Sequence, residues 1–350
     1  MLLAFDWTQL AQQIVIGLAS GGVWATLAVA LVVIYRSTGV INFAQGEMAM
    51  FSTFIAWSLV HHGFSYWGAF FLTLAISFAG GVAVERAVIR PVERAPVLTV
   101  VIVTLGLFFV VNGAARWIWS PETRSLPNAF STRPIDVAGV AFSISDLGTI
   151  AVSLGAVALL WVFFRFTKLG LASRAAAVNP EASRLVGVRV SWMLALGWGL
   201  AAALGAVSGM LTAPALASFD QNLMQPILLY AFAGAVLGGI DSPLGAVIGS
   251  LLLGVLVNLL GTYVDWIGSE LRLPVALAVI LGVLLIRPAG LFGRPVEQRV
   301  CWAAAPSGSR SGWPWLRRSS SSTRSPRAWS ATSTRATWPR PGSSSSRSSA

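Results

Sequence analysis

The chain has 350 residues, of which 55% are hydrophobic and 11% are charged, and its net charge is +11. This composition is too apolar for a soluble domain and indicates a protein whose solvent is the lipid bilayer. The excess charge does not indicate a nucleic-acid partner, because eight arginines lie between residues 310 and 347, where there is no acid. Without those eight the net charge is only +3, the difference between +11 and 8.

Nine segments are apolar and long enough to be spans, given that a helix needs roughly 20 mainly apolar residues to cross a bilayer. The predicted spans are residues 12–34, 41–60, 67–88, 97–118, 147–166, 191–212, 226–240, 244–262 and 272–287. The seventh is short and could be half of a membrane hairpin, so we predict about nine spans. The fold class predicted for residues 1–293 is therefore an all-α, polytopic transmembrane helical bundle.

Arginine and lysine divide the predicted loops into two sets, and loops rich in these residues stay in the cytoplasm. One set carries only Arg116, Arg124, Arg133 and Arg272. The other carries eleven, namely Arg36, Arg86, Arg90, Arg94, Arg165, Lys168, Arg174, Arg184, Arg189, Arg287 and Arg294. This distribution predicts an amino terminus outside the cell and a carboxyl terminus in the cytoplasm.

Glycines four residues apart recur inside the spans, where they allow helices to approach closely. The pairs are Gly17 with Gly21, Gly205 with Gly209, Gly234 with Gly238, and Gly245 with Gly249. Such pairs are typical of packing in any polytopic bundle and do not name a function.

Residues 294–350 form a Ser- and Arg-rich tail without a hydrophobic period. Such a segment cannot bury enough apolar surface to offset its ordering entropy, which predicts disorder. One lysine stands against twenty-three arginines in the whole chain, as in a GC-rich gene, so an aberrant, frame-shifted tail would also have this composition. A basic segment that binds a membrane surface or nucleic acid is the alternative.

The sequence offers no convincing catalytic or metal-binding set. The phosphate-binding loop of an ATPase ends in Gly-Lys-Ser/Thr, whereas the only lysine, Lys168, precedes Leu169. The only histidines, His61 and His62, are neighbours without a third ligand nearby. We therefore expect no enzyme activity, no cofactor and no metal, and any use of ATP must come from a partner subunit.

Polar residues interrupt the apolar sequence between Ser37 and Glu47. Polar groups inside a membrane are costly, and so they are candidates for function. Glycines at 39 and 46 permit local unwinding, which leads us to expect Asn42, Gln45 and Glu47 to face a substrate path or another helix rather than lipid. The alternative is a plain cytoplasmic loop in which Asn42 caps the second span.

A second interruption, from Leu237 to Gly245, places Asp241 between apolar segments. Interrupted helices in both halves of a transporter often flank the substrate path, which makes Asp241 a further candidate for that path. A tight turn between helices is the favoured alternative, because Ser-Pro follows the acid. Asn112 and Asn258 are isolated amides within spans, for which hydrogen bonding between helices is the commoner role.

The predicted cytoplasmic loop from Arg165 to Arg189 contains helix-start residues. Asn179 is suited to be a cap, and Pro180 and Glu181 are suited to a first turn. A short helix outside the membrane, ending at Gly187, is therefore expected. It is either a docking helix for a partner or an ordinary amphipathic loop helix.

These segments together resemble the branched-chain amino acid permease family of ABC importers, in the version that pairs two related membrane subunits. The resemblance covers about residues 10–293, and the tail has no counterpart in the family pattern. It rests on an ordered set of segments: Gly17 to Tyr35 continuing into Ile41-Asn42-Phe43-Ala44-Gln45-Gly46-Glu47, the cytoplasmic loop, Ala235-Val236-Leu237-Gly238-Gly239-Ile240, and Arg287-Pro288-Ala289-Gly290-Leu291-Phe292-Gly293.

The cytoplasmic loop also resembles the wider importer signature of Glu-Ala-Ala, three residues and Gly, which contacts the ATPase. The matching residues are Glu181, Ala182, Ser183, Arg184, Leu185, Val186 and Gly187. Ser183 replaces the second alanine, and the later Ile-x-Leu-Pro of sugar and peptide permeases is missing. The loop therefore supports coupling to an ATPase without fixing the subclass.

The resemblance implies a multi-pass permease subunit of the cell inner membrane that works by alternating access. Its implied partners are a second, homologous permease subunit, two cytoplasmic ATPase subunits and an extracytoplasmic substrate-binding protein. The implied cargo is branched-chain amino acids or related small amino acids and amides. A passive channel or uniporter for small polar solutes is the alternative, and it would need no docking loop.

Overall fold

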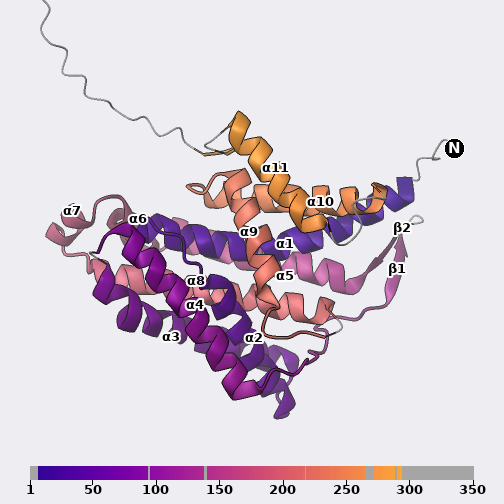
Figure 1. The fold of residues 1–350 in the computed structure, drawn as a ribbon, viewed down its shortest axis with the longest axis horizontal. Coiled ribbons are helices and arrows are strands. Elements are labelled where there is room, and N and C mark those ends of the chain that lie inside the picture. Colours follow the sequence, from indigo (N-terminus) through magenta and orange to yellow (C-terminus); the bar gives the residue numbers. More distant parts are fainter. Residues whose placement is uncertain are drawn as a thin grey trace, which may run out of the picture. The chain divides into compact units, whose positions relative to one another are not determined.

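The computed structural model describes residues 7–93, 95–137, 140–216, 218–264, 271–287 and 290–293, so the predicted tail at 294–350 lies outside the described residues. Within them the chain folds into eleven α-helices and one β-hairpin (Figure 1). The prediction of an all-helical polytopic architecture is confirmed. The helices are α1 (Trp7–Thr38), α2 (Gln45–His61), α3 (Tyr66–Val84), α4 (Val97–Trp119), α5 (Ile144–Phe166), α6 (Lys168–Val178), α7 (Pro180–Leu185), α8 (Val190–Thr212), α9 (Met224–Gly238), α10 (Pro243–Tyr263) and α11 (Arg272–Ile286).

Each of the nine predicted spans coincides with a helix, and α6 and α7 make up the two helices outside that set. Six helices in the described chain are long and apolar enough to cross a membrane, namely α1, α3 with its continuation to Val92, α4, α5, α8 with its continuation to Ala215, and α10. Helices α9 and α11 are apolar but shorter, and α2 has 17 residues. The orientation of the bundle remains a prediction.

Helix α1 forms the centre of the bundle, where it packs against α10, α8, α5 and α9. Its residues from Ala25 to Ile34 are all buried. Helices α4 and α5, by contrast, bury few of their apolar side chains, which are mostly exposed or half-buried, and α4 crosses one face of the bundle in Figure 1. An apolar helix that is buried all round belongs in the interior, and an apolar helix that is exposed needs lipid or a partner to cover it.

All four predicted glycine pairs lie at close contacts between helices. The first faces α10, the second faces α2, and the third and fourth face each other between α9 and α10. At Gly21, an added Cβ atom would lie 2.8 Å from the carbonyl oxygen of Ser250 and 2.9 Å from Cα of Leu251. These neighbours are backbone atoms that cannot rotate away, so only glycine fits there.

We expect Gly21→Val to destabilise the bundle, because α1 and α10 would have to separate. Overpacking of this kind costs about 1–3 kcal/mol. The matched control is Gly106→Val in α4, where an added Cβ atom meets no atom within 4 Å. Thermal unfolding of the purified variants should show a lowered Tm for Gly21→Val alone, and equal Tm values would contradict the packing described here.

The hairpin and α6 were not predicted. Strand β1 (Pro134–Val137) pairs antiparallel with β2 (Val140–Ser143), and each strand has only four residues, too few for a clear alternating pattern. The hairpin leads directly into α5, whose first turn is closed by a capping box. In this box the Ser143 side chain accepts from the backbone N–H of Asp146, and the Asp146 carboxylate accepts from the N–H of Ser143, both at 3.2 Å.

Candidate functional site

The chain is not helical between Thr38 and Gln45, as the polar interruption in the sequence predicted. Gly39 takes φ +71°, in the left-handed region that glycine adopts without strain. Asn42 then stabilises the turn: its Oδ1 accepts from the N–H of Ala44 at 3.1 Å, and its Nδ2 donates to Oε1 of Gln45 at 3.3 Å. The N-cap residue of α2 is Ala44, so the alternative in which Asn42 caps this helix is wrong.

The amino-terminal end of α2 lies inside the bundle. Nε2 of Gln45 donates to the carbonyl oxygen of Ala201 at 2.9 Å, and Ala201 is the middle residue of α8. The side chains of Asn42, Gln45 and Glu47 are exposed by only 1%, 0% and 1%. The three candidates are therefore buried in protein at the level of the middle of a long apolar helix, and their part in a substrate path remains a prediction.

Glu47 is the centre of a polar network that joins three helices. Its Oε2 accepts from Nδ2 of Asn112 on α4 at 2.9 Å, and its Oε1 accepts from Nε2 of Gln225 on α9 at 3.4 Å. Nε of Arg116 donates to Oδ1 of Asn112 at 2.7 Å, and its Nη2 donates to Oδ1 of Asn222 at 3.1 Å. We call Glu47, Asn112, Arg116, Asn222 and Gln225 the Glu47 network.

Two helix ends meet at this network, because Glu47 lies in the first turn of α2 and Gln225 lies in the first turn of α9. Helix N-termini carry partial positive charge, which favours a carboxylate beside them. Gly46 brings the two helices together, since an added Cβ atom there would lie 3.2 Å from the side chain of Leu228. The arrangement holds a buried acid with amide donors and two helix ends rather than with a direct ion pair.

Asp241 belongs to a different place in the fold. It is exposed in the turn between α9 and α10, where Gly239 takes φ +103° and the Ser242 side chain caps α10 by accepting from the N–H of Gly245 at 3.1 Å. This is the tight turn that was the favoured alternative. Asp241 lines a surface groove with Arg36 and makes no hydrogen bond to the Glu47 network within the described residues.

The short helix predicted after Asn179 exists as α7, and its cytoplasmic location remains a prediction. Oδ1 of Asn179 caps it by accepting from the N–H of Ala182 at 3.0 Å, and it ends before Gly187, which takes φ +86°. Ser183 is buried, whereas Leu185 is 89% exposed and Val186 is 79% exposed. Two adjacent apolar side chains at the tip of a loop helix are suited to contact a partner.

The sequence predicted only part of the Glu47 network. Asn112 was interpreted as an amide that bonds between helices, which the structure confirms, and Asn258 similarly donates to Gln13 on α1 at 2.7 Å. Arg116, Asn222 and Gln225 were missed. The polar run at residues 220–222, directly before an apolar segment, was the available signal. Among the described residues, no group of three His, Cys, Asp or Glu side chains could hold a metal ion.

Long apolar helices around a polar network centred on a buried acid define a polytopic membrane protein. The chain matches a family model, described as the permease component of the branched-chain amino acid transport system, over residues 13–286. It belongs to this family, the branched-chain amino acid transport permeases of ABC-type importers, as its sequence motifs indicated.

The proteins to which this chain is similar are named as permeases. The chain is 30% identical to the high-affinity branched-chain amino acid transport system permease protein LivH of Salmonella typhimurium, over 83% of this chain and 97% of that protein. It is 30% identical, with the same two coverages, to the permease protein BraD of Pseudomonas aeruginosa. A more distant relative, 22% identical over 82% of this chain and 81% of its own length, is the fructose import permease protein FruF of Bifidobacterium longum.

Family membership settles the general character of the chain. It is a multi-pass membrane protein and the permease component of its transport system, a component that has no ATPase activity of its own. Permeases of this class work with ATPase and substrate-binding proteins.

Proposed function

We propose that this chain is the membrane-spanning subunit of an ATP-driven importer for branched-chain amino acids or related small amino acids and amides. The observation that carries the proposal is the similarity to LivH and BraD, which extends over 97% of the length of each of these relatives. The weaker similarity to FruF makes a sugar the competing cargo.

The proposed path runs past the amino-terminal end of α2. Helices α2 and α9 both begin at the Glu47 network, α2 with its first turn inside the bundle, and helices that start within a membrane often border the substrate site of a transporter. Asn42, Gln45 and Glu47 are the polar side chains at that point, and burying them away from lipid avoids a cost of about 2.5 kcal/mol or more for the acid. Asp241 is proposed for the cytoplasmic mouth, because it is exposed on a groove beside the end of α1.

The proposed contact with the ATPase is the segment from Glu181 to Gly187. It combines a cap, an exposed turn and two exposed apolar side chains, Leu185 and Val186. We further propose nine spans with the amino terminus outside, and an assembly with a homologous second permease, two cytoplasmic ATPases and an extracytoplasmic binding protein. In this orientation α7 faces the cytoplasm.

The cargo is tested by competition in proteoliposomes that contain the chain with its partner permease, ATPases and binding protein. Uptake of radiolabelled leucine should be blocked by excess leucine, isoleucine or valine and left unchanged by excess fructose. Labelled fructose and a short amide are supplied in parallel reactions. Uptake of fructose without uptake of leucine would refute the proposed cargo while leaving the permease assignment intact.

A further inference from the structure

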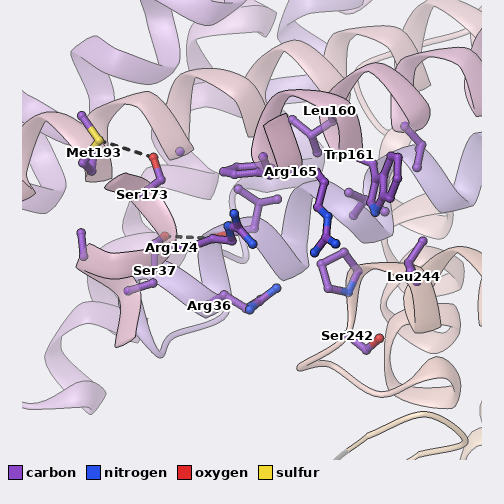
Figure 2. A pocket seen from close by; sticks show the side chains of 18 of the residues that line it. Arg36, Ser37, Leu160, Trp161, Arg165, Ser173, Arg174, Met193, Ser242 and Leu244 are labelled. Atoms are coloured by element: carbon purple, nitrogen blue, oxygen red, sulfur yellow. Dashed lines mark hydrogen bonds between the residues drawn. The ribbon is translucent and has the colours of Figure 1, made fainter. Parts of the chain in front are cut away.

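A cavity of about 320 Å³ lies where five helices meet, apart from the Glu47 network (Figure 2). Its lining comes from the last turns of α1 and α5, from α6, and from the first turns of α8 and α10. Because these are helix ends, the cavity lies at the level where a bundle of spanning helices meets the lipid headgroups. This position does not depend on which side of the membrane is the cytoplasm.

Three arginines line the cavity and no acid does. They are Arg36 in the last turn of α1, Arg165 in the last turn of α5, and Arg174 on α6. Figure 2 shows their side chains directed toward the same space. Within the described part of the chain none of them forms an ion pair, and Nε of Arg174 is buried without a hydrogen-bond partner. The cavity therefore gathers three positive charges with no acid in its lining; Asp241 lines the neighbouring groove with Arg36 but forms no ion pair with it.

The rest of the wall is mainly apolar and opens toward the outer surface of the bundle. Its larger side chains include Val33, Val157, Leu160, Trp161, Phe164 and Leu244, and three serines, Ser37, Ser173 and Ser242, also line the cavity. Trp161 is 46% exposed and Leu244 is 57% exposed, and Figure 2 shows both at the side of the cavity away from Arg174. A fitting ligand thus carries negative charge at one end and hydrocarbon at the other.

We propose that this cavity binds an anionic phospholipid. Its phosphate is held by Arg36, Arg165 and Arg174, and one acyl chain lies along Trp161 and Leu244. Basic pockets between spanning helices are suited to anionic headgroups, and guanidinium groups bind phosphate oxygens with paired hydrogen bonds. Binding relieves the repulsion among three converging cations and ties the end of α5 to α6, which predicts that the lipid stabilises the fold.

The test uses the full-length chain, purified and delipidated in a neutral detergent, with Tm measured after addition of phosphatidylglycerol, phosphatidylcholine or inorganic phosphate. Phosphatidylglycerol alone should raise Tm by several degrees. An equal rise with phosphate would assign the site to a free anion, and an equal rise with phosphatidylcholine would show that charge is not recognised. Either result overturns the proposal.

Variants test whether the rise in Tm with phosphatidylglycerol comes from binding in the cavity. The triple variant Arg36→Gln, Arg165→Gln, Arg174→Gln should lose the rise, whereas the control Arg90→Gln, Arg287→Gln, which removes exposed arginines outside the cavity, should keep it. Gly197→Leu provides a second variant that keeps all charges and fills the cavity, because an added Cβ atom meets only ordinary contacts at 3.8 Å and 4.0 Å. It too should lose the rise. If phosphatidylglycerol still raises the Tm of the triple variant, the lipid does not bind in this cavity. If the triple variant does not fold, the same result with Gly197→Leu refutes the proposal.

Discussion

Replacing Glu47 with leucine is expected to abolish ATP-dependent uptake and to lower the Tm of the permease. Leucine accepts no hydrogen bond, so Nδ2 of Asn112 would lose its 2.9 Å acceptor, and Nε2 of Gln225 would lose its weaker one at 3.4 Å. Each nitrogen keeps a second acceptor at 3.2 Å, the carbonyl oxygen of Gln221 for Asn112 and Oδ1 of Asn222 for Gln225. One N–H of each amide is left without a partner, and a buried donor in that state costs about 1–3 kcal/mol. Uptake into proteoliposomes and thermal unfolding of the same preparation measure the two effects.

The control Glu47→Gln separates charge from hydrogen bonding. A glutamine keeps the shape and one acceptor oxygen, and the Gln225 amide can turn to accept from the new NH₂ group. We expect this variant to unfold close to the wild-type Tm while its uptake falls, because the negative charge between the ends of α2 and α9 is lost. Wild-type uptake by both variants would remove Glu47 from the proposed path.

The second large effect is expected at the end of α7. Gly187 takes φ +86°, so Gly187→Val must strain the backbone by about 1–3 kcal/mol or move the exposed Leu185 and Val186 out of place. Uptake and co-purification of the ATPase subunits should both fall, while the amount of permease in the membrane stays unchanged. Asparagine tolerates the left-handed region, so Gly187→Asn is the matched control. This variant should retain most of the uptake and most of the co-purified ATPase.

The apolar side chains beside Gly187 provide an independent test of the proposed contact between α7 and the ATPase. Leu185→Asp should weaken ATPase binding about tenfold or more, equivalent to roughly 1.4 kcal/mol, because interface energy concentrates in a few apolar anchors. It leaves the backbone of α7 undisturbed, since Leu185 is 89% exposed. Normal co-purification of the ATPase with both Gly187→Val and Leu185→Asp would place the coupling contact elsewhere.

Hydropathy predicted the positions of the nine long or apolar helices, because a run of apolar residues is a local property of the sequence. The break before α2 was also predicted, since Gly39 and Asn42 are local signals, although the helix begins at Gln45 rather than at residue 41. The hairpin at residues 134–143 was missed because its strands are too short to show a period.

The candidate site was predicted only in part, for a physical reason. Glu47 and its neighbours stand out because an acid beside apolar residues is costly wherever it lies. Their partners do not stand out: Asn112 is 65 positions from Glu47 and Gln225 is 178 positions away, and only the tertiary packing of α2, α4 and α9 brings them together. Arg116 lies at the end of the predicted span 97–118 and was counted only for its charge, whereas the structure shows it in the last turn of α4, bonded to Asn112.

The most direct measurement of the proposed function is leucine uptake into proteoliposomes from which one component at a time is left out. The complete set of this chain, a second permease, two ATPases and the binding protein should accumulate leucine against its gradient when ATP is supplied on the ATPase side. Omission of the ATPases, or of ATP, should reduce uptake to the level of empty liposomes. Gradient-driven leucine flux through this chain alone would contradict the proposal and establish a passive channel or uniporter instead.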